Sequence, residues 1–292
     1  MPKGAAGSFA PVSLTPPSGG GDSRDAALFW NDENSQGRVL EAAGDENVSR
    51  VAYSINDNGE IVGVATNADL YPFPVYWPNF EVPSSNLRYE GYTRGQAYSI
   101  NNDGEIVGVA SNADGFYPAY WTNFEEAISN LKFEGYTQGV ATSINDGGEI
   151  VGYATNADNY LFPVYWTNSD AAISNLRHDG YTEGQAISIN GNGKIVGYAT
   201  NADDSRFPVY WTNSDAAISN LHYDGYTQGQ ALSINDNGKI VGLARNDLNN
   251  FPVYWTNYEE PIKNLNVPSG LLDLYGQFFR ARDINTGGQI VG

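Results

Sequence analysis

Residues 185–221 read QAISINGNGKIVGYATNADDSRFPVYWTNSDAAISNL. Four short segments of this stretch, at 185–190, 194–200, 207–213 and 217–221, are rich in β-branched, aromatic and small residues. Each is bounded by Gly, Asn, Asp or Ser, a pattern typical of strands joined by tight turns. No segment of the chain repeats its apolar residues with the 3.6-residue period of a helix. The stretch therefore predicts a unit of four β-strands and no helix.

The same unit recurs along almost the whole chain. The string Ile-Asn-x-x-Gly-x-Ile-Val-Gly begins at six positions, Ile55, Ile100, Ile144, Ile189, Ile234 and Ile284. Every Trp of the protein falls once per unit, at Trp30, Trp77, Trp121, Trp166, Trp211 and Trp255. A period of about 45 residues with four strands per unit is typical of a β-propeller blade, and a linear solenoid is the alternative.

The two ends of the repeat favour a ring over a solenoid. Residues 26–30 and 38–42 supply the third and fourth strands of a unit, whereas 280–285 and 289–292 supply the first and second. Together they make one complete unit, which a ring needs to close without an exposed edge. We predict an all-β, six-bladed β-propeller of four-stranded blades over residues 25–292, closed by N- and C-terminal strand pairs in one blade. Residues 1–24, rich in Gly, Pro and Ser, are predicted to be a flexible tail or linker.

The Asn-x-x-Gly part of each unit predicts a tight hairpin turn. In Asn145–Gly148, as in the other copies, a type I turn followed by a left-handed residue requires Gly at the last position. A calcium loop is the alternative interpretation, because Asp and Asn alternate there. The middle residues vary between copies, whereas a hard cation needs fixed oxygen ligands, so we predict no metal site.

The repeat resembles the HAF-type bacterial extracellular repeat family. The resemblance rests on Ile-Asn-x-x-Gly-x-Ile-Val-Gly, an aromatic strand ending in Trp, an Asn-Leu pair, and Gly-Tyr-Thr-x-Gly-x-Ala before the next Ile-Asn. It covers about residues 26–292. It implies an exported or surface-associated protein, and it assigns no chemistry.

Composition narrows the possible partners. Lys and Arg number 15 against 34 Asp and Glu, giving a formal charge of −19, which disfavours nucleic acid and anionic membranes. There is no Cys and there are only two His, so the composition disfavours thiolate or zinc sites and His-based catalysis. No apolar run is long enough for a membrane span. We expect no cofactor, no membrane insertion, an extracellular or cell-surface location, and a protein or neutral polysaccharide as partner, with self-association possible.

Candidate binding residues cluster in two kinds of loop that a propeller places on one face. Loops between the second and third strands carry Asn-Ala-Asp, and loops between blades carry Gly-Tyr-Thr. Aromatic rings bind the C–H faces of sugars, and carboxylates bind their hydroxyls. The candidate ligand residues are Tyr92, Tyr136, Tyr181, Tyr226, Asp69, Asp114, Asp158 and Asp203. The alternative is structural: Asx side chains cap turns, and a Tyr at a blade junction can belong to the core.

Three classes of function remain. The first is a non-enzymatic extracellular or surface scaffold and interaction module. The second is a multivalent carbohydrate-binding protein, and the third is a polysaccharide hydrolase or lyase. A catalytic centre on a propeller is expected to break the symmetry of the blades, and the one insertion, at 267–279, carries a single acid, Asp273. The sequence therefore predicts a protein that is not an enzyme.

Overall fold

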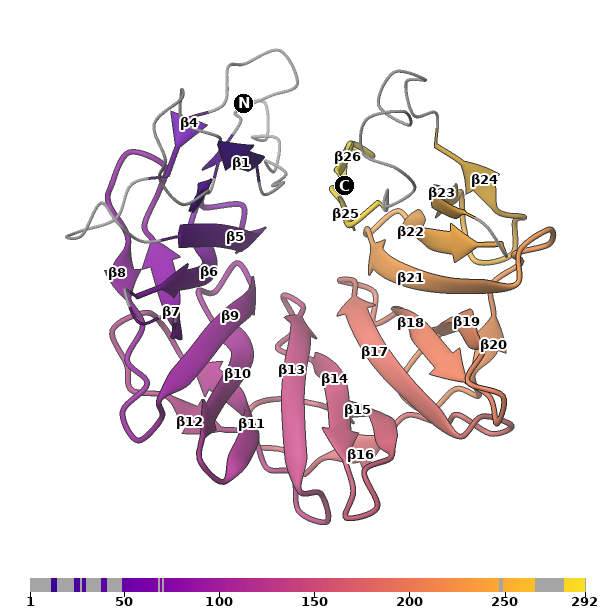
Figure 1. Cartoon of the computed structure of the whole chain (residues 1–292), viewed down its shortest axis with the longest axis horizontal. Coiled ribbons are helices and arrows are strands. Elements are labelled where there is room, and N and C mark those ends of the chain that lie inside the picture. The colour runs from indigo at the N-terminus through magenta and orange to yellow at the C-terminus, as the bar shows by residue number, and fades with distance from the viewer. Residues whose placement is uncertain are drawn as a thin grey trace.

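The computed structural model describes residues 12–14, 24–26, 28–29, 38–40, 49–67, 69, 71–246, 249–265 and 281–291. Over these residues the chain forms five four-stranded antiparallel sheets and three two-stranded ones, with no helix. Figure 1 shows the five larger sheets side by side around a common axis, each with its first strand innermost. The predicted all-β fold of four-stranded units is thus confirmed. In the described part of the chain no helix could cross a membrane.

The strands of the larger sheets follow the chain from the axis outward. The first sheet contains β5 (Ser49–Ile55), β6 (Ile61–Thr66), β7 (Pro72–Trp77) and β8 (Ser85–Asn86), and the second β9 (Arg94–Ile100), β10 (Ile106–Asn112), β11 (Gly115–Trp121) and β12 (Ser129–Asn130). The third contains β13 (Gln138–Ile144), β14 (Ile150–Thr155), β15 (Leu161–Trp166) and β16 (Ser174–Asn175), and the fourth β17 (Glu183–Ile189), β18 (Ile195–Thr200), β19 (Arg206–Trp211) and β20 (Ser219–Asn220). The fifth contains β21 (Gln228–Ile234), β22 (Ile240–Arg245), β23 (Asn250–Trp255) and β24 (Lys263–Asn264).

Three strand pairs lie outside these sheets. They are β1 (Val12–Leu14) with β2 (Arg24–Ala26), β3 (Leu28–Phe29) with β4 (Arg38–Val39), and β25 (Asp283–Ile284) with β26 (Ile290–Val291). The pair β1–β2 was not predicted, because residues 12–14 fall in the expected tail. The other two pairs occupy the segments predicted to form the shared blade.

The two ends of the repeat, which were predicted to share one blade, each pack against a neighbouring sheet. On one side, Ala281 and Ile284 pack with Val241 of the fifth sheet. On the other, Leu40 is buried in the core of the first sheet. Among the pairings made by the described residues, none joins β26 to β3.

The Asn-x-x-Gly turns have the predicted backbone. In the third sheet the Gly148 N–H donates to the Asn145 carbonyl (3.0 Å), and Gly148 has φ +76°. Only Gly adopts this left-handed conformation without strain, so the recurrence of Gly at this position follows from the hairpin.

The Asn side chain of this turn is fully used by the protein. Asn145 Oδ1 accepts hydrogen bonds from the N–H groups of Gly147 and Glu149, at 3.0 Å each. Its Nδ2 donates to the Glu149 carboxylate (2.7 Å) and to the Asn190 carbonyl of the next sheet (3.0 Å). The equivalent Nδ2-to-carbonyl bond joins every neighbouring pair from Asn56 to Asn285. The turn Asn therefore joins adjacent blades near the axis.

The hydrophobic core lies between the sheets. Trp166 is completely buried and packs with Ala141, Ile150 and Val164 of its own sheet, together with Val107 and Leu131 of the preceding one. Because each sheet buries its face against a neighbour, a single repeat cannot stand alone. In all five of the four-stranded sheets this Trp is fully buried.

Candidate functional site

The loops named as candidates do share one face of the protein. We call this surface the loop face: it comprises the loops between second and third strands (67–71, 112–116, 156–160, 201–205) and the loops between blades (87–93, 131–137, 176–182, 221–227). Thr137, in a loop between blades, donates from its N–H to the Thr155 carbonyl (2.8 Å) and from its hydroxyl to the Asn156 carbonyl (3.2 Å). These bonds fasten the Gly-Tyr-Thr segment to the start of the next sheet's Asn-Ala-Asp loop.

The four candidate tyrosines are half-buried at blade junctions. Tyr181 packs against the core of the fourth sheet, with its ring centroid 5.8 Å from that of Phe207. Its hydroxyl donates to Asn220 Oδ1 of β20. Tyr136 and Tyr226 make the equivalent contacts with Asn175 and Asn264, and Tyr92 accepts a hydrogen bond from Asn130 (2.6 Å). These rings and hydroxyls thus make contacts within the protein.

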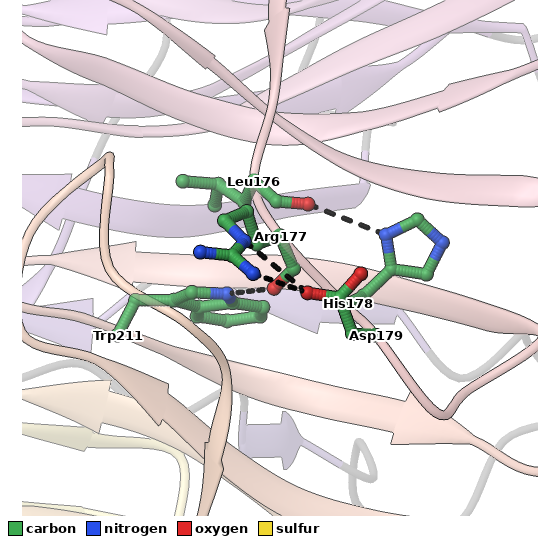
Figure 2. A network of polar contacts seen from close by, with 5 residues as sticks. All are labelled: Leu176, Arg177, His178, Asp179 and Trp211. Carbon is green, nitrogen blue, oxygen red and sulfur yellow. Dashed lines mark hydrogen bonds and ion pairs between the residues drawn. The ribbon is translucent and has the colours of Figure 1, made fainter.

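Figure 2 shows how one loop between blades is built. Trp211 Nε1 of the fourth sheet donates to the Arg177 carbonyl (2.7 Å), while Arg177 forms an ion pair with Asp179 (2.9 Å). His178 Nδ1 lies 3.3 Å from the Leu176 carbonyl (Figure 2). Its ring also packs edge-on against Phe162. Trp121, Trp166 and Trp255 make the equivalent bond to a loop carbonyl. The loop is therefore held by its backbone, and His178 serves the packing of the loop.

The four candidate aspartates are exposed at the tips of the Asn-Ala-Asp loops. In each loop the Asn side chain accepts a hydrogen bond from the Asp N–H, as in Asn156 to Asp158 (3.0 Å). The same bond is made at Asp69, Asp114 and Asp203 (3.1, 2.8 and 3.0 Å). The Asn thus caps the turn, and the carboxylate of each Asp points its charge to solvent rather than into the fold.

Exposed aromatic residues accompany three of these aspartates. These aromatic residues are not among the predicted site residues. Tyr71, Phe116 and Tyr160 are 42%, 50% and 50% exposed, each two residues after the loop Asp. Arg94 lies over the Tyr71 ring, 4.8 Å from its centroid. The comparison of repeats contained a signal for them: an aromatic residue recurs two positions after Asp in three loops and is absent from 201–205. The loop face therefore offers ring and carboxylate pairs on three successive blades.

No built metal centre accompanies these carboxylates. Among the residues that the structure describes, no three His, Cys, Asp or Glu side chains lie close enough together to hold an ion. The four candidate aspartates, Asp69, Asp114, Asp158 and Asp203, stand on four different sheets. The chemistry that this surface offers is ring stacking combined with hydrogen-bond acceptance.

Comparison with known proteins gives the fold class. No family model matches the chain, and no curated protein matches it significantly. Among solved structures, a puromycin hydrolase is similar with a TM-score of 0.60 and 12% identity, over 89% of this chain and 45% of the hydrolase. TolB from Acinetobacter baumannii is similar with a TM-score of 0.56 and 10% identity, over 82% of this chain and 59% of TolB. A prolyl endopeptidase is similar with a TM-score of 0.58 and 11% identity, over 84% of this chain and 40% of the endopeptidase. At these identities the likeness shows a propeller-like all-β fold, and the chain spans less than two thirds of each of these proteins.

These neighbours correct the expectation that the protein is not an enzyme. The same propeller-like architecture occurs in puromycin hydrolase and in prolyl endopeptidase, which are peptidases. The expectation rested on the near-equivalence of the blades and on the scarcity of His and Cys. Blade symmetry does not separate enzymes from other proteins here, since the shared architecture is present in proteins that catalyse hydrolysis.

Proposed function

We propose that this protein is an extracellular or cell-surface interaction module that binds an extended, neutral polysaccharide through its loop face. The observation that carries the proposal is the recurrence of an exposed aromatic residue two positions after an exposed Asp on three neighbouring blades. Tyr71, Phe116 and Tyr160 supply flat apolar surfaces for the C–H faces of sugar rings. Asp69, Asp114 and Asp158 supply acceptors for sugar hydroxyls. The extracellular location is supported by the resemblance to the HAF-type repeats.

Repetition of the site favours a polymer as the ligand. Each ring and carboxylate pair is small and solvated, so a single sugar unit would bind it weakly. A polymer that reaches two or three blades binds the second pair at a high effective concentration, which multiplies the affinity by a factor of about 100 or more. The formal charge of −19 repels acidic polymers at low salt, so a neutral chain is the favoured class.

We propose further that the ring is closed by a sixth blade built from both ends of the repeat. Its inner pair would be β25–β26, and its outer pair β3–β4. Support comes from Ile284, which packs on the fifth sheet, and from Leu40, which is buried against the first. Both positions are those that the strands of a sixth blade would occupy relative to their neighbours. A closed disc would hold the three ring-bearing loops at fixed spacing.

The binding proposal is tested by native affinity electrophoresis in gels that contain soluble neutral polysaccharides. A triple variant, Tyr71→Ala with Phe116→Ala and Tyr160→Ala, should lose at least tenfold in affinity for a polysaccharide that retards the wild type. Its melting temperature should stay near the wild-type value, because the three rings are about half exposed. Retardation of the triple variant equal to that of the wild type would show that these rings do not bind the polymer.

A matched control lies on another part of the surface. Val82 is 41% exposed but belongs to the loop between β7 and β8, which a meandering sheet places on the opposite face. Val82→Ala removes an exposed apolar group without touching the loop face, so retardation should be unchanged. Single variants of the three rings should each weaken binding only slightly, since the remaining two blades still engage the polymer.

A further inference from the structure

A chamber of about 400 Å³ lies on the axis, away from the loop face. Its walls come from the innermost strands β5, β9, β13, β17, β21 and β25, together with Tyr153 of β14. A second space of about 230 Å³ lies at the end of the axis where the Asn-x-x-Gly turns gather. Ser54 and Asp283 line both, so the two spaces are neighbours along the axis. The volume of the chamber falls within the range of small-molecule sites.

One residue breaks the symmetry of this chamber. The residue before the repeated Ile-Asn is Ser in five copies, at Ser54, Ser99, Ser143, Ser188 and Ser233. Four of these hydroxyls accept a hydrogen bond from the Ile N–H of the next blade, at 3.3 to 3.4 Å. In the sixth copy the residue is Asp283. A Ser there would suffice for packing, since Ser meets the same need in the other five copies.

The carboxylate of Asp283 is only partly used by the protein. Its Oδ1 accepts hydrogen bonds from the Ser233 hydroxyl (2.6 Å) and the Ile284 N–H (2.9 Å). The side chain is exposed to the axial space although it sits deep within the ring, and desolvation raises its pKa. Asp283 is thus positioned by two donors and still accessible from the chamber.

The remaining walls are aromatic on one side and apolar on the other. Tyr53 and Tyr98 have ring centroids 5.4 Å apart, and Tyr153 lines the same chamber. Ile187 and Leu232 form part of the opposite wall. Aromatic faces attract organic cations, and apolar side chains accept a hydrocarbon body.

Charge along the axis points to a cationic ligand. Asp57, Asp146 and Asp236 line the smaller space at the turn end, and Asp283 lies between it and the chamber. Arg282 lines the chamber near Tyr53. Burial raises the pKa of the Tyr53 hydroxyl, and the positive charge of Arg282 partly offsets that rise. Among the described residues of the chamber lining, the one cation, Arg282, is balanced by the one anion, Asp283, and the three aspartates of the smaller space make the axis acidic overall.

We infer that the axial chamber is a binding site for a small monocationic amine with an apolar body, whose ammonium group pairs with Asp283. The amine enters past the carboxylates of the turn end, and its body lies between the tyrosines and the wall of Ile187 and Leu232. This site is separate from the loop face and does not depend on polysaccharide binding.

Phenethylamine is the test ligand, measured by isothermal titration calorimetry against the full chain. The uncharged 2-phenylethanol has a similar shape and serves as the matched comparison. We expect phenethylamine to bind the wild type at least tenfold more tightly than the alcohol, because a charge-assisted bond to Asp283 forms only with the amine. Absence of measurable amine binding, or equal binding of the two compounds, would overturn the inference.

The variant Asp283→Ser restores the residue that five other blades already accommodate. It should fold and lose at least tenfold in amine affinity. Should it fail to fold, Asp283→Asn keeps the size and acceptor of the side chain and makes the same test. Asp215→Ser removes one exposed carboxylate elsewhere and should leave binding unchanged.

A second variant tests the location. Leu232→Tyr places in the fifth blade the residue that Tyr53 and Tyr98 provide at the same position of the first two, and it fills the chamber without altering charge. It should abolish amine binding. Unaltered affinity in both Asp283→Ser and Leu232→Tyr would show that the amine binds elsewhere and refute the axial site.

Discussion

Replacing Asn145 with Ala should strongly destabilise the protein, because this one amide holds a turn and an interface between blades. The side chain is 5% exposed and makes four hydrogen bonds. Each bond contributes about 1 kcal/mol net, and the one to the Glu149 carboxylate somewhat more. The sum is about 4 kcal/mol. In the variant the Glu149 carboxylate still accepts a hydrogen bond from the Tyr165 hydroxyl (2.6 Å), which limits the stability lost through Glu149.

Urea unfolding followed by the fluorescence of the Trp residues measures this change. A loss of about 4 kcal/mol should also lower the melting temperature by roughly 10 °C in a domain of this size. Asn168→Ala is the matched control, because Asn168 also accepts a bond from a turn N–H (Asp170, 3.0 Å) but is exposed and joins no neighbouring blade. That control should cost about 1 kcal/mol or less. A loss in Asn145→Ala no larger than in Asn168→Ala would refute the interface role of the turn Asn.

Asn145→Asp tests the donor group of the amide apart from its acceptor oxygen. The Asp keeps an acceptor for the N–H groups of Gly147 and Glu149 but loses both Nδ2 donors. At neutral pH its charge also faces the Glu149 carboxylate and the Asn190 carbonyl. The destabilisation should therefore persist at pH 7 and become smaller at acid pH, where the new carboxyl takes up a proton and can donate again.

Three further changes test the packing, the loop face and the axial carboxyl. Gly152→Ala should cost more than about 3 kcal/mol in urea unfolding, because the new Cβ would lie 2.0 Å from the Val140 carbonyl oxygen, and an unchanged midpoint would contradict the close approach of these strands. Tyr181→Phe removes only the hydroxyl contact with Asn220 and should lower stability by about 1 kcal/mol, whereas Tyr181→Ala should lose about 2 to 3 kcal/mol because the half-buried ring leaves the core. Burial raises the pKa of Asp283 in the folded protein. Its contribution to the free energy of unfolding is therefore fully present below the ordinary pKa of 3.8 and is lost as the pH rises through the raised pKa. Melting curves of wild type and Asp283→Asn from pH 3 to 8 should diverge in favour of the variant as the pH rises, and parallel curves would show that Asp283 does not carry this penalty.

The sequence was sufficient wherever the structure depends on neighbours along the chain. Strand positions were predicted to within about two residues, as for 185–190 against Glu183–Ile189. The outermost strands are shorter than predicted, since 217–221 contributes only Ser219–Asn220 to pairing. The Gly at the end of each Asn-x-x-Gly turn was assigned correctly, because a left-handed residue in a tight hairpin is a local requirement.

The roles of the candidate site residues could not be read from one repeat. Tyr181 is predicted as a ligand residue because its loop is polar, and only the structure shows that its hydroxyl contacts Asn220, 39 positions away. The exposure of Tyr160 depends likewise on what the neighbouring loops leave uncovered. Asp283 could have been found by comparing the six copies residue by residue, since it alone replaces Ser before Ile-Asn.

The strands and turns of one unit, and the sixfold recurrence of its Ile-Asn-x-x-Gly-x-Ile-Val-Gly string, can be read from the sequence, because hydrogen-bonded hairpins depend on residues close together in the chain. Which polar and aromatic side chains are engaged between blades, and which remain accessible, became clear from the folded arrangement of the repeats. The physical reason is that burial and hydrogen bonding at a blade junction join residues of different repeats, about 45 positions apart, and the axial chamber joins all of the repeats at once.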